Sequence, residues 1–453
     1  MLLPPGPSWP SLLQTAAIVS RPIPFLTRCF QRYGDAFTLR VLGPGSPPVV
    51  FLSHPEALQQ IFASATDDLE FGKVTYVFRP LVGQESLIMQ QGDRHRRQRQ
   101  ILMPALHGQH LHSYGETIQA IATGVTRSWQ VDQTLAIRPL MADISLEVIL
   151  RVVFGLQPGP RYRQLQGYLA DLLEAITGAL YSVQFFAPLL QQNLGPWSPW
   201  GRFVRRRAAI DELLYAEIAE RRQGDLSRSD VLSLLLTAKD GDGEPLSDQE
   251  LRDQLMTLLL LGHETTASSL AWAFYWIHQD SAVRDRLLAE LAPLGPQPDP
   301  MALQRLPYLN ALCQETLRLY PIALISQPRR VCHRVSLGPY CFEPGTILVP
   351  CIYTAHRRLE AYPEPLSFRP ERFLQQPPSP YEFLPFGGGS RSCIGSALSL
   401  YEMKVVLATV LQRYRLRLDY DQPLRPQRRG ITFVPPEQVR FTITALSRSC
   451  RPS

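Results

Sequence analysis

Apolar side chains recur every three or four positions along most of the chain, a period typical of amphipathic helices. This pattern predicts helices over 22–33, 93–104, 113–128, 140–155, 161–182, 200–222 and 229–238. Two short segments within 36–53 instead alternate between apolar and polar positions, as strands do. We therefore predict a mainly α fold with a minor β-rich part, which lies near 36–53, 328–352 and 415–446.

The strongest helical pattern begins after Ser247 and continues to Gln279. Ser247 and Glu250 have the spacing of a capping box, which marks a helix start. The helix is apolar almost all round, so we expect it to run through the centre of the protein. The polar residues GHETT interrupt it at 262–266. Buried polar groups cost free energy unless they are hydrogen-bonded. The cluster therefore either bonds back to the helix backbone and kinks it, or it serves a functional site.

Composition narrows the class of protein. The chain has 453 residues, enough for roughly two to four domains, yet no repeat and no low-complexity linker divides it. Its net charge of +6 comes without zinc-ligand spacing or an RNA-binding motif, so no nucleic-acid partner is expected. The seven cysteines are an odd number without a CxxC pair, which favours a reducing compartment.

Membrane insertion is not indicated. No segment reaches the ~18 consecutive apolar residues that span a bilayer. The N-terminal segment 1–20 is rich in proline, which argues against a signal peptide or a membrane anchor. We therefore expect a soluble, cytoplasmic protein without a transmembrane anchor.

The stretch 383–407 places one cysteine between glycines and a helical pattern. A thiol ligates metal as the thiolate. The helix predicted just after Cys393 offers free N–H groups and a positive dipole end, which favour that form. The glycines at 387–389 would let the backbone turn tightly and approach a flat ligand, and Arg391 could pair with a carboxylate of that ligand. The alternative is a buried free cysteine beside a glycine turn.

The sequence FGGGSRSCIG resembles the FxxGxRxCxG haem-binding signature of the cytochrome P450 family. Other stretches resemble motifs of the family in the expected order. GDRHRRQR resembles the early helix that reaches the haem, and GHETT resembles the oxygen-activating motif. ETLR resembles the ExxR motif, and PERF resembles the motif that follows it. The resemblance covers about residues 4–445 and implies a single domain, 1–453. It also implies a cytochrome P450-like fold with the long central helix over the haem, similar to soluble bacterial members and particularly to cyanobacterial ones.

The resemblance implies haem b, iron protoporphyrin IX, with the thiolate of Cys393 as axial metal ligand. His95 and Arg99 would meet the haem propionates, and His95 stands where the family usually has tryptophan. Arg330 is expected as a further propionate partner, with Arg329 as the competing choice. The remaining expected contacts to the cofactor are Arg391, Phe386, Gly387, Gly395, Ile88 and Gly262.

Glu315 and Arg318 of the ETLR motif are three positions apart and share one helix face. An exposed pair would contribute little to stability, but the neighbouring leucines indicate burial. A buried pair needs further hydrogen bonds, and the resemblance implies Arg372 of PERF as the third partner. We expect these three side chains to be structural and to support the cysteine loop.

The resemblance implies catalytic roles for Glu264 and Thr265. Thr265 would hydrogen-bond dioxygen or its water, and Glu264 would relay protons from solvent. The family usually has Ala or Gly just before the glycine of this motif, whereas this chain has Leu261. A leucine there would narrow the pocket or shift the substrate away from the iron.

The implied function is that of a haem-thiolate monooxygenase, an oxidoreductase that inserts one oxygen atom of O2 into an apolar substrate such as a fatty acid, an alkane or a terpenoid-like compound. Two other classes stay open: a haem-thiolate peroxygenase or hydroperoxide isomerase or dehydratase, and a non-catalytic haem-binding protein. The residues expected to line the substrate pocket are Tyr76, Phe78, Phe185, Phe186, Leu261, Ile322, Leu324, Ile325 and Phe433.

Electrons must come from another protein, since the chain has no flavin or iron–sulfur motif of its own. We expect a ferredoxin or flavodoxin type donor with its reductase, and a monomeric enzyme. Arg94, Arg96 and Arg97 would point outward from the early helix and form a candidate docking patch for an acidic electron carrier.

Overall fold

The structure, a computed structural model of the chain, describes residues 3–41, 43, 45–64, 68–71, 75–177, 184–185, 190–224, 228–241, 243–420, 424–430 and 432–446, without the side chains of 174–177. The chain divides into two compact units. The first comprises Met1–Tyr76, Ala323–Phe368 and Gln376–Cys393, and the second comprises Val77–Ile322, Arg369–Gln375 and Ile394–Ser453. Each unit therefore combines segments that are far apart in the sequence.

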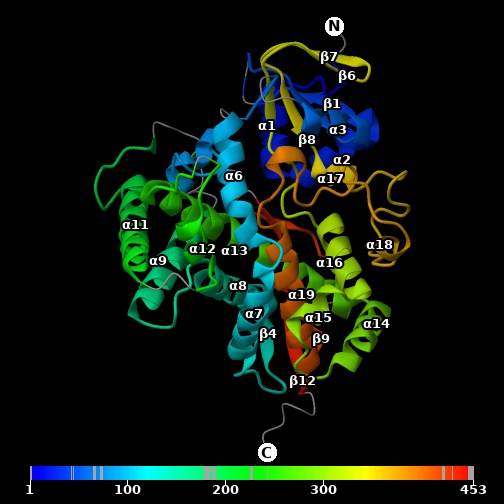
Figure 1. Cartoon of the computed structure of the whole chain (residues 1–453). Coiled ribbons are helices and arrows are strands. Elements are labelled where there is room, and N and C mark those ends of the chain that lie inside the picture. The colour runs from blue at the N-terminus through cyan, green and yellow to red at the C-terminus, as the bar shows by residue number, and fades with distance from the viewer. Residues whose placement is uncertain are drawn as a thin grey trace, which may run out of the picture. The chain divides into compact units, whose positions relative to one another are not determined.

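A five-stranded mixed sheet is the centre of the first unit (Figure 1). Its strand order is β1-β2-β8-β5-β3, with β2 and β8 parallel and the other neighbouring pairs antiparallel. The strands are β1 (Ala36–Leu39), β2 (Val49–Leu52), β8 (Ile347–Pro350), β5 (Arg329–Val331) and β3 (Leu69–Glu70). All four residues of β2 are apolar and buried, so this strand does not show the predicted alternation, because it lies in the interior of the sheet. The strands predicted within 36–53 and 328–352 are nevertheless confirmed.

The described part of the first unit also has α-helices and a hairpin. They are α1 (Ser11–Ser20), α2 (Pro22–Tyr33), α3 (Pro55–Ala63) and α17 (Ile352–Ala355), with the hairpin of β6 (Val335–Leu337) and β7 (Tyr340–Phe342). α1 lies within the proline-rich segment 1–20 and begins after Pro10, a position where proline does not interrupt the helical hydrogen bonds. α3 buries Leu58 and Ile61 in one apolar cluster with the strands of the sheet.

The second unit is mostly helical (Figure 1). Its helices include α5 (Arg79–Val82), α6 (Gly92–Leu106), α7 (His110–Thr126), α8 (Ile137–Val148), α9 (Pro160–Thr177), α11 (Pro199–Gln223), α12 (Val231–Thr237), α13 (Asp248–Gln279), α14 (Ser281–Leu291), α15 (Pro300–Gln304), α16 (Pro307–Leu319), α18 (Arg372–Gln375) and α19 (Ser396–Arg413). Two small sheets have the strand orders β4-β12-β9 and β10-β11. Their strands are β4 (Thr134–Ala136), β9 (Tyr414–Leu418), β10 (Gln427–Arg429), β11 (Thr432–Val434) and β12 (Arg440–Leu446), so the β-rich part predicted near 415–446 is confirmed.

The long helix α13 has the predicted bounds and the predicted cap. The Glu250 N–H donates to Ser247 Oγ at 3.2 Å, and the Ser247 N–H donates to Glu250 Oε2 at 2.9 Å, which together form the capping box. Most side chains of α13 are buried, because α8, α16 and α19 pack around it (Figure 1). Neither α13 nor any other described helix is apolar enough over a sufficient length to cross a membrane.

Three helical segments differ from the predicted limits. The segment predicted as one helix over 140–155 is α8 followed by a π-helical turn, Ile149–Val153, in which the hydrogen bonds span one residue more. The helix predicted over 161–182 is described as α9 up to Thr177, and its predicted end lies outside the described residues. α14 was not predicted, because Val283, Leu287 and Leu291 form only a narrow buried stripe on a short helix.

Replacing Ser247 by Ala removes the oxygen that accepts from the first turn of α13. We expect the free energy of unfolding to fall by about 1 kcal/mol, because the N–H of Glu250 loses its partner. Urea unfolding followed by circular dichroism would record this as a lower midpoint. Ser247→Asp keeps an acceptor at the same position and is the matched control. Equal midpoints for Ser247→Ala and the unmodified protein would contradict a stabilising role of the cap.

Candidate functional site

Cys393 closes a short loop in the first unit. Its N–H donates to the Phe386 carbonyl at 2.8 Å, and the Gly387 N–H donates to the Leu384 carbonyl at 2.9 Å. Among the described cysteines, Cys393 is exposed, whereas the others are buried or half-buried. Phe386 and Gly387 are themselves half-buried. Because a reactive thiolate must be accessible to its ligand, Cys393 is the described cysteine best placed to bind a metal.

The glycines of this loop pack against Phe62 of α3. Gly389 has a φ of +67°, which side chains rarely adopt, and a Cβ there would lie 2.7 Å from the Phe62 carbonyl oxygen. A Cβ at Gly388 would lie 2.6 Å from the Phe62 ring. From the sequence we expected these glycines to approach a flat ligand; at these two positions the close neighbour is α3 instead.

Two arginines of the first unit gather beside Phe71. The guanidinium carbon of Arg329 lies 4.8 Å from the ring centre of Phe62 and 4.9 Å from that of Phe71, and that of Arg391 lies 4.5 Å from Phe71. Arg329 is 2% exposed, and its Nε and Nη1 have no hydrogen-bond partner among the described residues. Burial, and to a lesser extent the charge of Arg391, lowers the pKa of Arg329 to about 9. An anionic group of a ligand would satisfy these nitrogens and offset the buried charge.

Arg330, the propionate partner expected from the sequence, faces a different environment. Successive residues of a strand point to opposite faces of a sheet, and the Arg330 side chain is 41% exposed while Arg329 is buried. Arg330 Nη1 lies 3.7 Å from the carboxylate of Glu70 on β3. Of the two arginines that the sequence left open, Arg329 is therefore the one with unsatisfied buried nitrogens.

His356 supports the cysteine loop and was not identified from the sequence. Its Nε2 accepts from the Leu384 N–H at 2.8 Å, and its ring stacks on Phe383 with 5.6 Å between the ring centres. The side chain is fully buried. A single histidine outside any motif is usually interpreted as a core residue, so only the tertiary contact reveals this supporting role.

The structure brings Glu315, Arg318 and Arg372 together in the second unit. Glu315 Oε2 accepts from Arg318 Nε at 2.6 Å, and Oε1 accepts from Arg318 Nη2 at 2.8 Å and from Arg372 Nε at 3.1 Å. The backbone N–H of Arg369 donates to the same Oε1 at 2.8 Å. The side chains of Glu315 and Arg318 are fully buried. The carboxylate thus has the several partners that a buried charge requires.

One face of α13 is more exposed than the rest of the helix. Leu261 is 37% exposed and Thr265 is half-buried, and the four-residue spacing places both on this face. Thr265 Oγ1 donates to the Leu261 carbonyl at 2.8 Å, and Thr266 Oγ1 donates to the Gly262 carbonyl at 3.0 Å. The bonding of threonines back to the helix, which the sequence allowed, is therefore present. It leaves a large apolar side chain exposed beside a hydroxyl group.

Glu264 is buried on α13 between two arginines. Arg138 of α8 donates from Nη1 to Glu264 Oε1 at 2.7 Å, and Nε of Arg429 on β10 lies 3.4 Å from the same oxygen. Each arginine also has a terminal nitrogen 3.5 Å from Glu437 Oε1, and Glu437 is 70% exposed. The four side chains therefore connect a buried carboxylate to an exposed one. Arg138, Arg429 and Glu437 were missed in the sequence, because they come from α8, from β10 and from the turn between β11 and β12.

His263, next to Glu264, carries no charge at neutral pH. Its side chain is 5% exposed, and burial lowers its pKa to about 4, with smaller contributions from the charges of Arg138 and Arg429. Its Nε2 lies 3.1 Å from the Ala142 carbonyl, which favours the tautomer with the proton on Nε2. The positive charge beside Glu264 is therefore supplied by the two arginines.

The early helix α6 places the two expected propionate partners on one face. His95 is 6% exposed, and Arg99, one turn further on, is half-buried. Ile88, which precedes the helix, is also half-buried. These positions have the partial burial that contact with a ligand requires, and they belong to the second unit.

Arg97 of the same helix does not point outward as expected. It forms an ion pair with Asp240, and its Nη1 donates to Glu250 Oε1 at 3.2 Å. Arg94 and Arg96 are exposed, as expected for a surface patch. Arg97 instead ties α6 to the start of α13, because these acidic side chains lie on or before that helix.

The residues expected to line the substrate pocket differ in burial. Ile322 and Phe433 are buried and adjacent, since the Phe433 N–H donates to the Ile322 carbonyl at 3.0 Å. Phe185 is buried with its ring edge-on to Trp200 and Phe203. Of the others, Leu324 is buried, Phe78 and Ile325 are half-buried, Tyr76 is 57% exposed, and Phe186 lies outside the described residues. Gly262, an expected contact to the cofactor, is half-buried.

Known sequences agree with this arrangement. The family model described as Cytochrome P450 matches residues 3–442. A Mycobacterium bovis protein, provisionally named cytochrome P450 135B1, is 34% identical over 449 residues, which cover 98% of this chain and 92% of that protein. A Mycobacterium tuberculosis protein, provisionally named cytochrome P450 137, is 34% identical over 421 residues, 92% of this chain and 85% of that protein.

Solved structures agree with the fold. Cyanobacterial CYP120A1 with bound retinoic acid has a TM-score of 0.83 and 27% sequence identity, and the match covers 97% of this chain and 99% of that chain. The haem domain of cytochrome P450DA has a TM-score of 0.85 at 21% identity over 98% of both chains, a likeness of fold. With the family match over nearly the whole length and the exposed cysteine in its signature loop, this chain belongs to the cytochrome P450 family of haem-thiolate monooxygenases.

Proposed function

We propose that this chain binds haem b through Cys393 and inserts one oxygen atom of O2 into a small apolar substrate. Membership of the family supports the haem, the thiolate ligand and the monooxygenase reaction. The observation that best supports an active enzyme is the exposed face of α13, where Leu261 and Thr265 lie beside the buried Glu264. A haem protein without turnover would gain nothing from a buried carboxylate next to that face.

The surroundings of Cys393 suit a flat ligand with two carboxylates. Arg329 and Arg391 bring two guanidinium groups to one aromatic side chain, and Arg329 has two buried nitrogens without an acceptor among the described residues. Propionates would accept from both groups in charge-assisted hydrogen bonds. We assign Arg329 and Arg391 as propionate partners, and His95 and Arg99 of α6 as further ones.

The bound haem would supply the oxidation chemistry, because electron donation from a thiolate ligand favours cleavage of the O–O bond. The chain itself holds the thiolate, shields the reaction from water and delivers protons. Cys393 precedes the first residue of α19 by three positions, and the free N–H groups at a helix start favour a negatively charged sulfur. His356 holds the Leu384 N–H on the other side of the loop.

Thr265 and Glu264 would deliver protons along α13. Thr265 Oγ1 donates to the Leu261 carbonyl, and rotation about its Cα–Cβ bond would turn the same proton toward the exposed face of the helix. Glu264 lies one residue earlier and would restore the proton that Thr265 gives up. The pair thus has an acid with a route to the surface and a hydroxyl that faces the substrate.

Two arginines would connect Glu264 with the surface. Arg138 donates to Glu264 Oε1 at 2.7 Å, and Arg429 Nε lies 3.4 Å from the same oxygen. Glu437 is close to both arginines and is exposed, so it competes for them. Movement of the arginines between the two carboxylates would open a polar route from Glu264 to solvent.

An apolar substrate fits the side chains that are expected around it. Leu261 is the largest exposed apolar group on α13, and Ile322, Leu324 and Phe433 add further apolar surface. The related cyanobacterial structure holds retinoic acid, a mostly apolar molecule with one carboxylate. We therefore favour a fatty acid, an alkane or a terpenoid-like compound, and Leu261 would limit how closely a bulky substrate approaches the iron.

Reduction of this enzyme would require a separate carrier. The match with the family model covers residues 3–442, and we propose a ferredoxin or flavodoxin type donor with its reductase. The exposed Arg94 and Arg96 of α6 would contact an acidic carrier. A monomer would be sufficient for this exchange.

Cys393→Ala should abolish the thiolate signature of the haem. The reduced protein with carbon monoxide should show a strongly red-shifted Soret band, and the variant should lose it because its axial sulfur is gone. The spectra are compared at equal haem content. Cys332→Ala, in the same unit, is the matched control and should keep the band. A band that survives in Cys393→Ala would overturn the ligand assignment.

Glu264→Gln should lower the rate of product formation by about a hundredfold, because an amide cannot serve as the proton-transfer acid. The rate is measured with saturating substrate, dioxygen and a ferredoxin–reductase pair. Glu437→Gln removes a carboxylate from the same two arginines at an exposed position, so it is the matched control and should change the rate only severalfold. Equal losses in both variants would indicate a charge effect on the arginines and contradict a proton-delivery role of Glu264.

Thr265→Ala should uncouple electron use from oxidation, so that product formed per NADPH falls by about tenfold or more and hydrogen peroxide rises in proportion. Thr266→Ala is the matched control, because Thr266 is buried against Ser399, 3.0 Å away, and does not face the substrate. Unchanged coupling in Thr265→Ala would remove Thr265 from the mechanism. Product formation from peroxide alone, with none from dioxygen and reductase, would favour a peroxygenase instead.

A further inference from the structure

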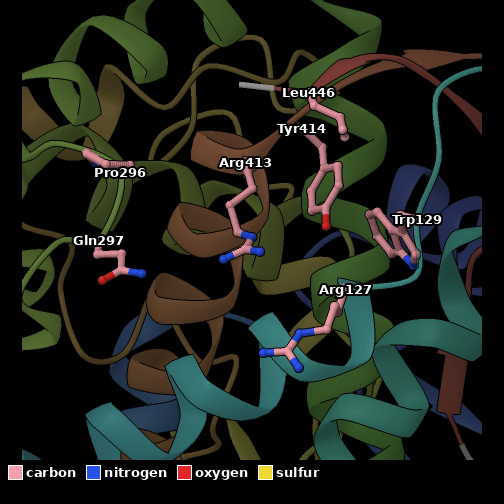
Figure 2. A pocket seen from close by; sticks show the side chains of 7 residues that line it. All are labelled: Arg127, Trp129, Pro296, Gln297, Arg413, Tyr414 and Leu446. Atoms are coloured by element: carbon pink, nitrogen blue, oxygen red, sulfur yellow. The ribbon is translucent and has the colours of Figure 1, made fainter. Parts of the chain in front are cut away.

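A pocket in the second unit lies at the C-terminal end of α19, whereas Cys393 precedes the N-terminal end of that helix. The cavity has a volume of about 370 Å³. Its walls come from the residues after α7, the start of β9, the loop before α15 and the end of β12 (Figure 2). None of these residues has a role in the proposed monooxygenase reaction.

Two positive charges share this cavity. Arg127 and Arg413 both line it, and Figure 2 shows their guanidinium groups directed into the same space. None of the described lining residues is acidic. Nε of Arg413 is buried and has no hydrogen-bond acceptor in the part of the chain that the structure describes. Two like charges in one cavity repel each other, and a buried donor without an acceptor costs free energy. An anion between them would relieve both.

A simpler explanation accounts for part of this arrangement. Arg413 is the last residue of α19 and Arg127 follows α7, and cations are favourable at the C-terminal end of a helix dipole. That role requires only a cation near the last carbonyl groups. It does not explain why Arg413 buries a donor without an acceptor, nor why its guanidinium group and that of the exposed Arg127 line the same cavity.

The aromatic wall of the pocket is rigid. Trp129 and Tyr414 are 5% and 3% exposed, and their ring centres are 5.0 Å apart. The Tyr414 hydroxyl donates to the Thr126 carbonyl at 2.5 Å, which fixes the ring against the end of α7. The cavity therefore offers an apolar surface that does not need to rearrange when a ligand arrives.

The opposite wall is held in place by side-chain hydrogen bonds. Gln119 of α7 donates from Nε2 to the Pro298 carbonyl at 2.9 Å, and Gln412 of α19 donates from Nε2 to the Leu291 carbonyl at 3.1 Å. The first bond ties the segment between α14 and α15 to α7, and the second ties the end of α14 to α19. Gln297 lies in this segment, and Figure 2 shows it across the cavity from Arg413. The two walls are thus set before any ligand binds.

We propose that this pocket binds a small organic anion, with its carboxylate or phosphate between Arg127 and Arg413 and its apolar part against Trp129 and Leu446. Paired guanidinium groups recognise either anion through charge-assisted hydrogen bonds. The volume is in the range of small-molecule sites, and a fixed apolar wall with a few polar groups is their usual composition. The site is separate from the haem chemistry and does not depend on which substrate is oxidised.

The test is a calorimetric titration of the haem-loaded protein with 2-naphthyl phosphate, 2-naphthoate, 2-naphthol and inorganic phosphate. We expect saturable binding of one or both naphthyl anions, weaker binding of inorganic phosphate and none of 2-naphthol at this site. Comparison of the two naphthyl anions distinguishes a phosphate site from a carboxylate site. Arg127→Gln and Arg413→Gln should each raise the Kd about tenfold or more.

Arg415→Gln is the matched control. Arg415 is on the exposed side of β9, two residues from Arg413, so its loss changes the net charge equally without altering the pocket. Its Kd should stay within about twofold of the unmodified protein. An equal loss of affinity in all three variants would show that the probe is attracted non-specifically by positive charge. If no saturable binding occurs, or if the pocket variants bind as tightly as the unmodified protein, the arginines serve only as cations at the helix ends. Each of these outcomes overturns the proposal.

A measurement on the unmodified protein covers the case in which a pocket variant does not fold. Phenylglyoxal modifies accessible arginines, and mass spectrometry of the peptides gives the rate at each one. The naphthyl anion that binds more tightly should slow the modification of Arg127 and Arg413 severalfold and leave that of Arg415 unchanged. Unchanged rates at Arg127 and Arg413 under saturating probe would refute the site.

Discussion

The buried carboxylate of Glu315 is the interaction on which the packing of Arg369–Gln375 against α16 depends. It accepts from Arg318 on its own helix and from the side chain of Arg372 and the N–H of Arg369. The segment Arg369–Gln375 lies between two stretches of the first unit in the sequence, yet it packs with α16 in the second. Removing one partner would leave an uncompensated charge, at a cost of about 3–5 kcal/mol. The network therefore holds α16 and this segment together through a fully buried carboxylate.

On α13, a second buried carboxylate is compensated in a different way. Glu264 is also buried, but its partners Arg138 and Arg429 come from other elements and also contact the exposed Glu437. Glu315 has several fixed donors and no exposed competitor among the contacts described. Glu264 has two arginine partners, and both also lie close to the exposed Glu437. Glu264 is thus linked through its two arginines to an exposed carboxylate, whereas the side chains that hold Glu315 are buried or half-buried.

Much of the fold follows from local sequence patterns. Each prediction that was wrong or left open has a physical reason. The limits of α13 were predicted correctly, because the capping box and the apolar run are local signals. α14 was missed, since its buried stripe of Val283, Leu287 and Leu291 is narrow. The choice between Arg329 and Arg330 could not be made from adjacent positions in one sequence. It depends on which face of β5 is covered, and the structure buries Arg329.

The sequence by itself determined the family and the metal chemistry, because the spacing of FGGGSRSCIG around Cys393 is a local requirement that little else satisfies. It also indicated the central helix and the pairing of Glu315 with Arg318, which are three positions apart. Only the tertiary structure decided which charges are compensated and by what. The arginines beside Glu264, the histidine behind the cysteine loop, and the arginine pair at the end of α19 all join elements that are distant in the sequence. The role of these side chains depends on how deeply they are buried and on where they point, and a sequence pattern specifies neither.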